Sequence, residues 1–192
     1  MIVGDFVDYY NVGRIGSQQV DARVTFKAHY AGVNNVIDAI DNDIDFSDGE
    51  RNEWIDITTD FNRTLNVQDP FIELEISFFT GLLAHNAATT PTTPIDVNAF
   101  SLSVYDVDNE QFVAVAGSTG SQLAPNTHLI RSAQNVDGTS FLRIQSPNAN
   151  TSMNDGTSLN VGRVTFDMPS LRTFTIRLGV KPDGTTSRDC LL

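Results

Sequence analysis

Strict alternation of apolar and polar residues is the strongest pattern in this sequence, and it predicts β-strands. Four segments show it: 20–30, 71–79, 100–105 and 173–180. A period of two residues is typical of a strand that buries one face and exposes the other. In the first segment we therefore expect Val24, Phe26 and Ala28 to face the core, whereas Asp21 and His29 face solvent.

Shorter apolar runs and turn residues complete an all-β pattern. The runs lie at 54–61, 112–116, 129–130, 141–144 and 163–168, with an entry strand within 1–19 and the beginning of another strand at 186–192. The pair Asp137-Gly138 predicts a hairpin turn, because such turns need residues with positive φ. Helical spacing in 33–40 leaves room for one short helix.

Many short strands joined by polar turns predict a β-sandwich or a barrel. We expect an antiparallel β-sandwich with long Asp-rich loops that bind Ca²⁺ and at most one or two short helices. The 192 residues show no internal repeat and no change in composition, so 1–192 is expected to be one domain. We expect this domain to belong to a much longer surface protein.

Charge and cysteine content narrow the class of protein. The formal net charge is −12, and the only lysines are Lys27 and Lys181, which argues against nucleic acid or an anionic membrane as a partner. The single cysteine, Cys190, excludes an internal disulfide. No stretch is long and apolar enough to insert into a membrane. We expect a bacterial surface protein in which Ca²⁺ takes the structural place of disulfides.

The segment 100–113, FSLSVYDVDNEQFV, carries the most specific chemistry. If the alternation of its first residues continues, Asp106 and Asp108 fall on the apolar side of the strand, and Glu110 follows. A buried carboxylate is costly unless it is paired or holds a cation, and Ca²⁺ is bound through oxygen ligands. We therefore expect Asp106, Asp108 and Glu110 to bind Ca²⁺. The alternative is a polar turn that follows a strand.

A second acidic stretch, 32–49, places many aspartates close together. They are Asp38, Asp41, Asp43, Asp45 and Asp48. The stretch does not fit the EF-hand template, which requires a glycine at position six and a glutamate at position twelve. We expect Ca²⁺ in an irregular loop here, with Asp38, Asp41 and Asp43 as ligands. The alternative is a solvated loop that binds no ion.

Other chemistries have weaker support in the sequence. His29, His85 and His128 lack the spacing of a zinc site, and the run 117–121, GSTGS, lacks the lysine of a phosphate-binding loop. No serine lies in a nucleophile elbow, and no pair of carboxylates stands out as glycosidase machinery. We therefore expect that the protein is not an enzyme.

The order of the motifs resembles a known family. A strand VDARVTF, an Asp-rich loop, the strand FIELEISFF, the segment FSLSVYDVDN and the strand FTIRLGV follow one another. This order is similar to that of the Ca²⁺-dependent peptide-binding domain of giant repeats-in-toxin adhesins, with Tyr105 to Asp108 as its most specific part. The resemblance implies a lectin-like, jelly-roll-like sandwich with bound Ca²⁺. It also implies that the terminal carboxylate of a partner protein completes a Ca²⁺ site near Asp106 and Asp108.

These observations lead to one leading hypothesis and two alternatives. We expect a secreted adhesin module, monomeric, that binds the C-terminal residues of a protein or peptide on a host or neighbouring cell and supports adhesion and biofilm formation. Tyr105, Asn109 and Asp45 are expected to contact that ligand. The first alternative is a Ca²⁺-dependent carbohydrate-binding module, for which the partner is a glycan. The second is a structural extender domain of an adhesin.

Overall fold

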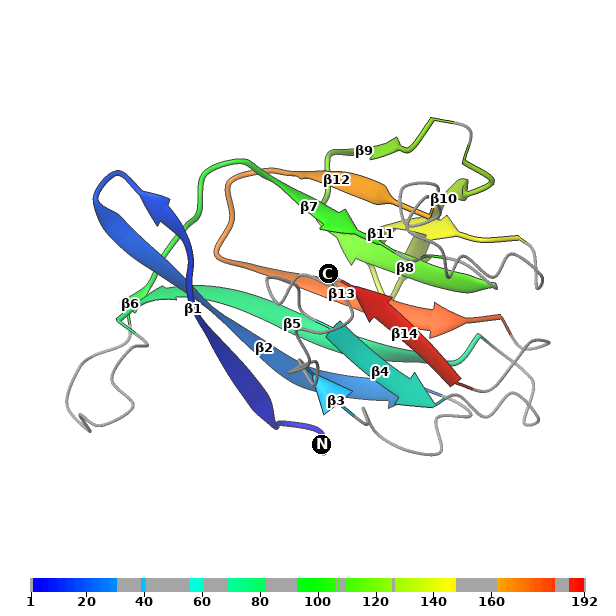
Figure 1. Cartoon of the computed structure of the whole chain (residues 1–192), viewed down its shortest axis with the longest axis horizontal. Coiled ribbons are helices and arrows are strands. Elements are labelled where there is room, and N and C mark those ends of the chain that lie inside the picture. Colours follow the sequence, from blue (N-terminus) through cyan, green and yellow to red (C-terminus); the bar gives the residue numbers. More distant parts are fainter. Residues whose placement is uncertain are drawn as a thin grey trace, which may run out of the picture.

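The computed structural model contains three antiparallel sheets (Figure 1). It describes residues 2–30, 39–40, 56–60, 69–81, 93–105, 107, 110–125, 127–147, 162–181 and 187–191. All regular elements in these ranges are strands, and none of the described residues belongs to a helix. Among these residues there is accordingly no helix that could cross a membrane. The prediction of an all-β, antiparallel fold is confirmed.

The largest sheet curves around the core of the molecule. Its strand order is β1 (Phe6–Ile15), β2 (Gln18–Tyr30), β5 (Phe71–Thr80), β13 (Thr173–Val180), β8 (Gln111–Ala116), β11 (Thr139–Gln145) and β10 (Ile130–Val136), and β6 (Thr93–Pro94) pairs with β5. The second sheet has the order β7 (Phe100–Val104), β12 (Val164–Met168) and β9 (Gly120–Leu123). The third consists of β14 (Ser187–Leu191), β4 (Asp56–Asp60) and β3 (Ala39–Ile40).

The first two sheets form a β-sandwich over one apolar core. The strand β5 has the burial pattern of a half-buried strand, with Ile72 and Leu74 fully buried. From the opposite sheet, Val104, Val164 and Phe166 are each 0% exposed and belong to the same cluster. The residues that alternate in the sequence therefore meet between the two sheets, as their periodicity predicts.

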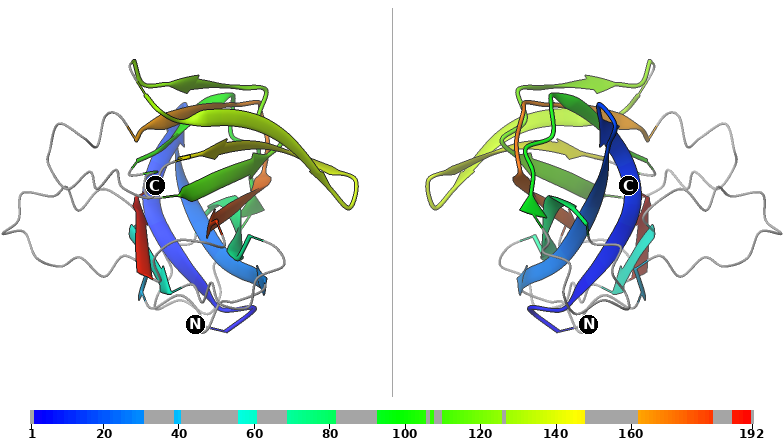
Figure 2. Two further views of the ribbon diagram at one scale, coloured as in Figure 1. Left: turned by 90° about the vertical axis from the view of Figure 1, so that its right-hand side faces the viewer. Right: turned by 90° about the vertical axis from the view of Figure 1, so that its left-hand side faces the viewer.

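The hairpin predicted at Asp137-Gly138 is confirmed. Val136 pairs with Thr139 across a two-residue turn in which Asp137 has φ 50° and Gly138 has φ 84°. Positive φ at both turn residues is the conformation of a type I′ turn. The hairpin β10–β11 arches away from the rest of the sandwich (Figure 2).

Two local features of β2 differ from the prediction. Asp21 was expected to face solvent, but it is 0% exposed, and its Oδ1 accepts hydrogen bonds from the Asn11 backbone N–H and the Gln19 side chain. The carboxylate thereby holds an irregularity in β1, where pairing with β2 shifts between Tyr9 and Gly13. A buried carboxylate is tolerated here because backbone and amide donors satisfy it.

The second difference arises from a bulge at Lys27. Pairing between β2 and β5 shifts between Phe26 and Ala28, so that His29 lies opposite the buried Ile72. His29 therefore lies on the same face as Ile72 and stacks on Phe26, with ring centroids 6.1 Å apart, but its side chain remains exposed, as predicted. One extra residue in a strand reverses the orientation of every side chain after it, which explains why strict alternation failed beyond Lys27.

A smaller apolar cluster covers the outer face of the large sheet. It contains Phe112, Ala114 and Phe141, with Phe71, Ala116 and Val136 packed against it. The guanidinium of Arg143 lies 3.7 Å from the centre of the Phe112 ring, and that of Arg177 lies 4.2 Å from the centre of the Phe141 ring. Both arginines also form ion pairs, with Asp69 at 2.6 Å and with Glu73 at 2.7 Å. These stacked arginines shield the rings from water.

Candidate functional site

Two of the predicted site residues lie in the described part of the chain, and they flank the acidic run. Tyr105 is half-buried directly after β7, and Glu110 directly precedes β8. The remaining predicted ligand and contact residues lie outside the described residues. They are Asp38, Asp41, Asp43, Asp45, Asp106, Asp108 and Asn109. The described residues of this segment are Tyr105, Val107 and Glu110, and the candidate site is described from them and from their neighbours.

The alternation used to place Asp106 does not extend through the segment. Val104 and Val107 are 0% and 1% exposed and belong to the same core cluster, although they are three residues apart. In a regular strand, residues three apart point to opposite faces. The regular strand ends at Val104, and the Val107 backbone N–H donates to the Gly162 carbonyl at 3.1 Å. Val107 is thus the core residue of this segment, which the sequence pattern did not identify.

Glu110 is a buried acidic residue at the end of the sandwich. It is 6% exposed and has φ 71°, a conformation that residues other than glycine rarely adopt. Its carbonyl accepts a hydrogen bond of 3.0 Å from the Lys181 backbone N–H, so the end of β13 holds it in place. A buried glutamate held in a strained conformation is a feature typical of functional sites.

Other buried polar residues gather at the same end of the sandwich. Gln111 is 2% exposed, and its carbonyl accepts a hydrogen bond of 3.0 Å from the backbone N–H of Ser146, which is 0% exposed. The Ser146 hydroxyl lies 3.1 Å from Nε2 of His128. We refer to Glu110, Gln111, His128 and Ser146 together as the polar end. These residues come from three segments that the sheet order brings together.

The described residues of the polar end provide oxygen atoms that could bind a metal ion, but they do not form a complete set of ligands. A carboxylate, an amide and a hydroxyl are the donor types that Ca²⁺ accepts. Within the described ranges, no three histidine, cysteine, aspartate or glutamate side chains converge as a metal group would require. The acidic group of the polar end is Glu110, which follows residues 106–109 in the sequence.

Of the four residues of the polar end, the sequence pattern singled out Glu110 and not Gln111, His128 or Ser146. Gln111 lies just before the apolar run 112–116, and Ser146 lies just after the run 141–144. His128 was considered only as a zinc ligand. The available signal was weak, since a polar residue next to a strand has no distinctive spacing when its partners are far away in the sequence.

Comparisons with known proteins give no family for this chain. No protein-family model matches it, and no curated protein and no solved structure matches it either. The similarity to adhesin modules is therefore supported by the sequence motifs alone.

Proposed function

We propose that this chain is a Ca²⁺-dependent, non-enzymatic binding module of a bacterial cell surface that recognises the C-terminal residues of a partner protein. The observation that carries the proposal is the burial of Glu110 at 6% exposure, immediately after the acidic run 106–109. Hard divalent cations prefer oxygen ligands, so the carboxylate of Glu110 and those of its acidic neighbours are suited to share one Ca²⁺ ion.

In this proposal Ca²⁺ has two roles. It neutralises Glu110 together with Asp106 and Asp108, which removes the repulsion between these carboxylates, and it offers an open coordination position to the terminal carboxylate of the partner. Tyr105 and Asn109 flank the same loop in the sequence and contact the ligand. A second ion is bound by Asp38, Asp41 and Asp43, and Asp45 of that stretch also contacts the ligand.

Thermal unfolding with added Ca²⁺ and with EDTA tests the first role. Calcium sites of extracellular modules have a Kd of about 10⁻⁴–10⁻³ M, so a titration to 10 mM covers the range. We expect the Tm to rise with Ca²⁺ and to be insensitive to the same concentration of Mg²⁺, because Mg²⁺ demands a tighter octahedral site. A Tm that Ca²⁺ leaves unchanged contradicts the proposal.

A library of peptides with free C-termini tests the second role. We expect binding in Ca²⁺, no binding in EDTA, and loss of binding when the terminal carboxylate is amidated. Peptides that bind equally well after amidation would show that the carboxylate is not the group recognised. Binding of glycans alone in a parallel Ca²⁺-dependent screen would favour a carbohydrate-binding module, and a Ca²⁺-dependent Tm without any ligand would favour an extender domain.

A further inference from the structure

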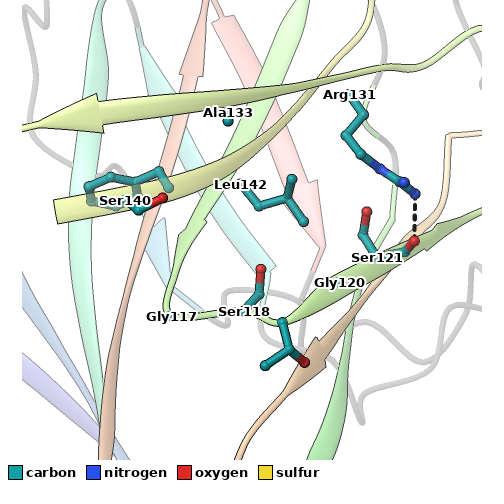
Figure 3. A pocket seen from close by; sticks show the side chains of 10 residues that line it. Gly117, Ser118, Gly120, Ser121, Arg131, Ala133, Ser140 and Leu142 are labelled. Atoms are coloured by element: carbon teal, nitrogen blue, oxygen red, sulfur yellow. Dashed lines mark hydrogen bonds between the residues drawn. The ribbon is translucent and has the colours of Figure 1, made fainter.

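A cleft opens between the two sheets of the sandwich, away from the polar end. It lies where β9, an edge strand of the second sheet, approaches β10, an edge strand of the large sheet (Figure 3). Its volume is about 370 Å³, at the lower end of the range for small-molecule sites. Its polar lining consists of Ser118, Thr119, Ser121, Arg131 and Ser140, and its apolar lining includes Ala133 and Leu142. We call it the intersheet cleft.

Polar residues occupy inward-facing positions in this cleft. Ser121 pairs with Phe166, and Arg131 pairs with Ile144, and both of these partners are 0% exposed. Residues directly opposite each other in antiparallel strands lie on the same face of the sheet. Ser121 and Arg131 therefore hold positions that a sandwich ordinarily fills with apolar side chains. Ser121 is half-buried and Arg131 is exposed, so the space between these two edge strands is lined by polar groups and open to solvent.

Two hydroxyl groups in the cleft are buried and have no hydrogen-bond partner among the residues that the structure describes. They are Ser118 Oγ and Ser121 Oγ, and both point from the β8–β9 segment toward the β10–β11 hairpin (Figure 3). Buried side-chain oxygens in native proteins are nearly always hydrogen-bonded to protein, water or ligand. A hydroxyl can both donate and accept, so the two serines are suited to a ligand that carries hydroxyl groups of its own.

Arg131 adds positive charge at the mouth of the cleft. One of its guanidinium nitrogens donates a hydrogen bond to the Ser121 carbonyl, which fixes the side chain across the cleft. Among the described residues, no carboxylate forms an ion pair with Arg131. A guanidinium has five N–H donors, and its planar shape matches a carboxylate. Arg131 therefore favours a ligand that carries a carboxylate.

We propose that the intersheet cleft binds an acidic monosaccharide unit, a hydroxylated ring with one carboxylate, as in a hexuronate. The carboxylate pairs with Arg131, the ring hydroxyls satisfy Ser118 and Ser121, and the apolar face of the ring packs on Leu142. This site differs from the Ca²⁺ site proposed at the polar end, and it requires no metal ion.

Calorimetric titration of the full chain with sodium D-glucuronate and sodium D-galacturonate, in EDTA, tests the proposal. Glucose and galactose serve as neutral probes, and acetate serves as a carboxylate without a ring. We expect a uronate to bind at least tenfold more tightly than the matching neutral sugar and than acetate. Absence of uronate binding overturns the proposal, as does equal affinity for acetate, because a simple carboxylate would then suffice.

Two variants assign the binding to the cleft. The double variant Ser118→Ala with Ser121→Ala should weaken uronate binding at least tenfold, while its Tm stays unchanged or rises because unpartnered hydroxyls are removed. Arg131→Gln, at an exposed position, should abolish the preference for uronate over neutral sugar. The matched control is Ser132→Ala, which removes an exposed hydroxyl from the other face of β10 and should leave binding unchanged.

The outcomes separate this proposal from the one for the polar end. Uronate affinity that is the same in Ca²⁺ and EDTA supports the cleft even if peptide binding fails. Uronate binding that requires Ca²⁺, or that survives both the serine and the arginine substitutions, overturns the assignment to the cleft.

Discussion

The two ends of the sandwich are closed by different kinds of contact. At one end Phe78, Phe100 and Phe174 form a cluster, with ring centroids 5.5 Å apart for Phe78 and Phe100 and 6.0 Å apart for Phe100 and Phe174. We call this the aromatic end. The polar end, around Glu110 and Ser146, lies at the other end of β13. Phe174 is the second residue of this strand, whereas Gln111 pairs with its last residue, Val180.

The two kinds of contact are suited to different tasks, ring packing to stability and exchangeable hydrogen bonds to binding. Ring packing is non-directional, excludes water and leaves no group to exchange with a ligand. The hydrogen bonds of the polar end involve specific donors and acceptors, which can exchange one partner for another. We infer that the aromatic end contributes mainly to the free energy of unfolding, whereas the polar end has the donors and acceptors that the proposed binding function requires.

The largest effect is expected from Phe174→Ala at the aromatic end. Removal of a buried phenylalanine costs about 3–5 kcal/mol of unfolding free energy, because a cavity remains. Denaturant unfolding measures this loss. The increase of Tm that we propose for Ca²⁺ should be the same in the variant as in the unmodified protein. Its loss in the variant alone would mean that the two ends are coupled.

Glu110→Gln tests the polar end directly. At a free Ca²⁺ concentration of about one hundred times Kd, one site specific for the folded state adds about 2.7 kcal/mol. We expect the amide to abolish most of this increment, since a neutral ligand binds Ca²⁺ far more weakly than a carboxylate. The control is Glu75→Gln on β5, which removes a carboxylate that pairs with Lys27 and should leave the increment intact.

Gly179→Ala disturbs packing near the polar end without removing a polar side chain. A Cβ at this position would lie 2.5 Å from Cζ of Phe112 and even nearer the Pro70 carbonyl, so the neighbours must move. Overpacking of this kind costs about 1–3 kcal/mol, measured by denaturant unfolding. The Ca²⁺ increment should remain, which distinguishes a packing defect from the loss of a ligand in Glu110→Gln.

The smallest effect is expected from Ser146→Ala. The variant loses the contact of 3.1 Å with His128 but keeps the backbone hydrogen bond to Gln111. One hydrogen bond contributes about 0.5–1.5 kcal/mol to stability. Thermal unfolding at several pH values should show this loss, and Ser101→Ala, at an exposed position on β7, should show none.

Part of the candidate site could be predicted from the sequence. The acidic run after an alternating strand drew attention to Glu110 and Tyr105, because carboxylates next to a buried strand are unusual. Gln111, His128 and Ser146 could not be predicted, since only the pairing of β8 with β11 places Ser146 next to Gln111. The cleft could not be predicted for the same reason, because Ser121 on β9 and Arg131 on β10 belong to different sheets.

The sequence by itself determined where most strands lie, which residues of the regularly alternating segments face the core, and the turn at Asp137-Gly138. These features depend on a period of two residues and on local backbone preferences, which any short segment displays. Only the tertiary structure decided the sheet order, the burial of Asp21, the reversal after Lys27 and the core position of Val107. Each of these depends on which distant strand is the neighbour, and one inserted residue is enough to exchange the two faces of a strand.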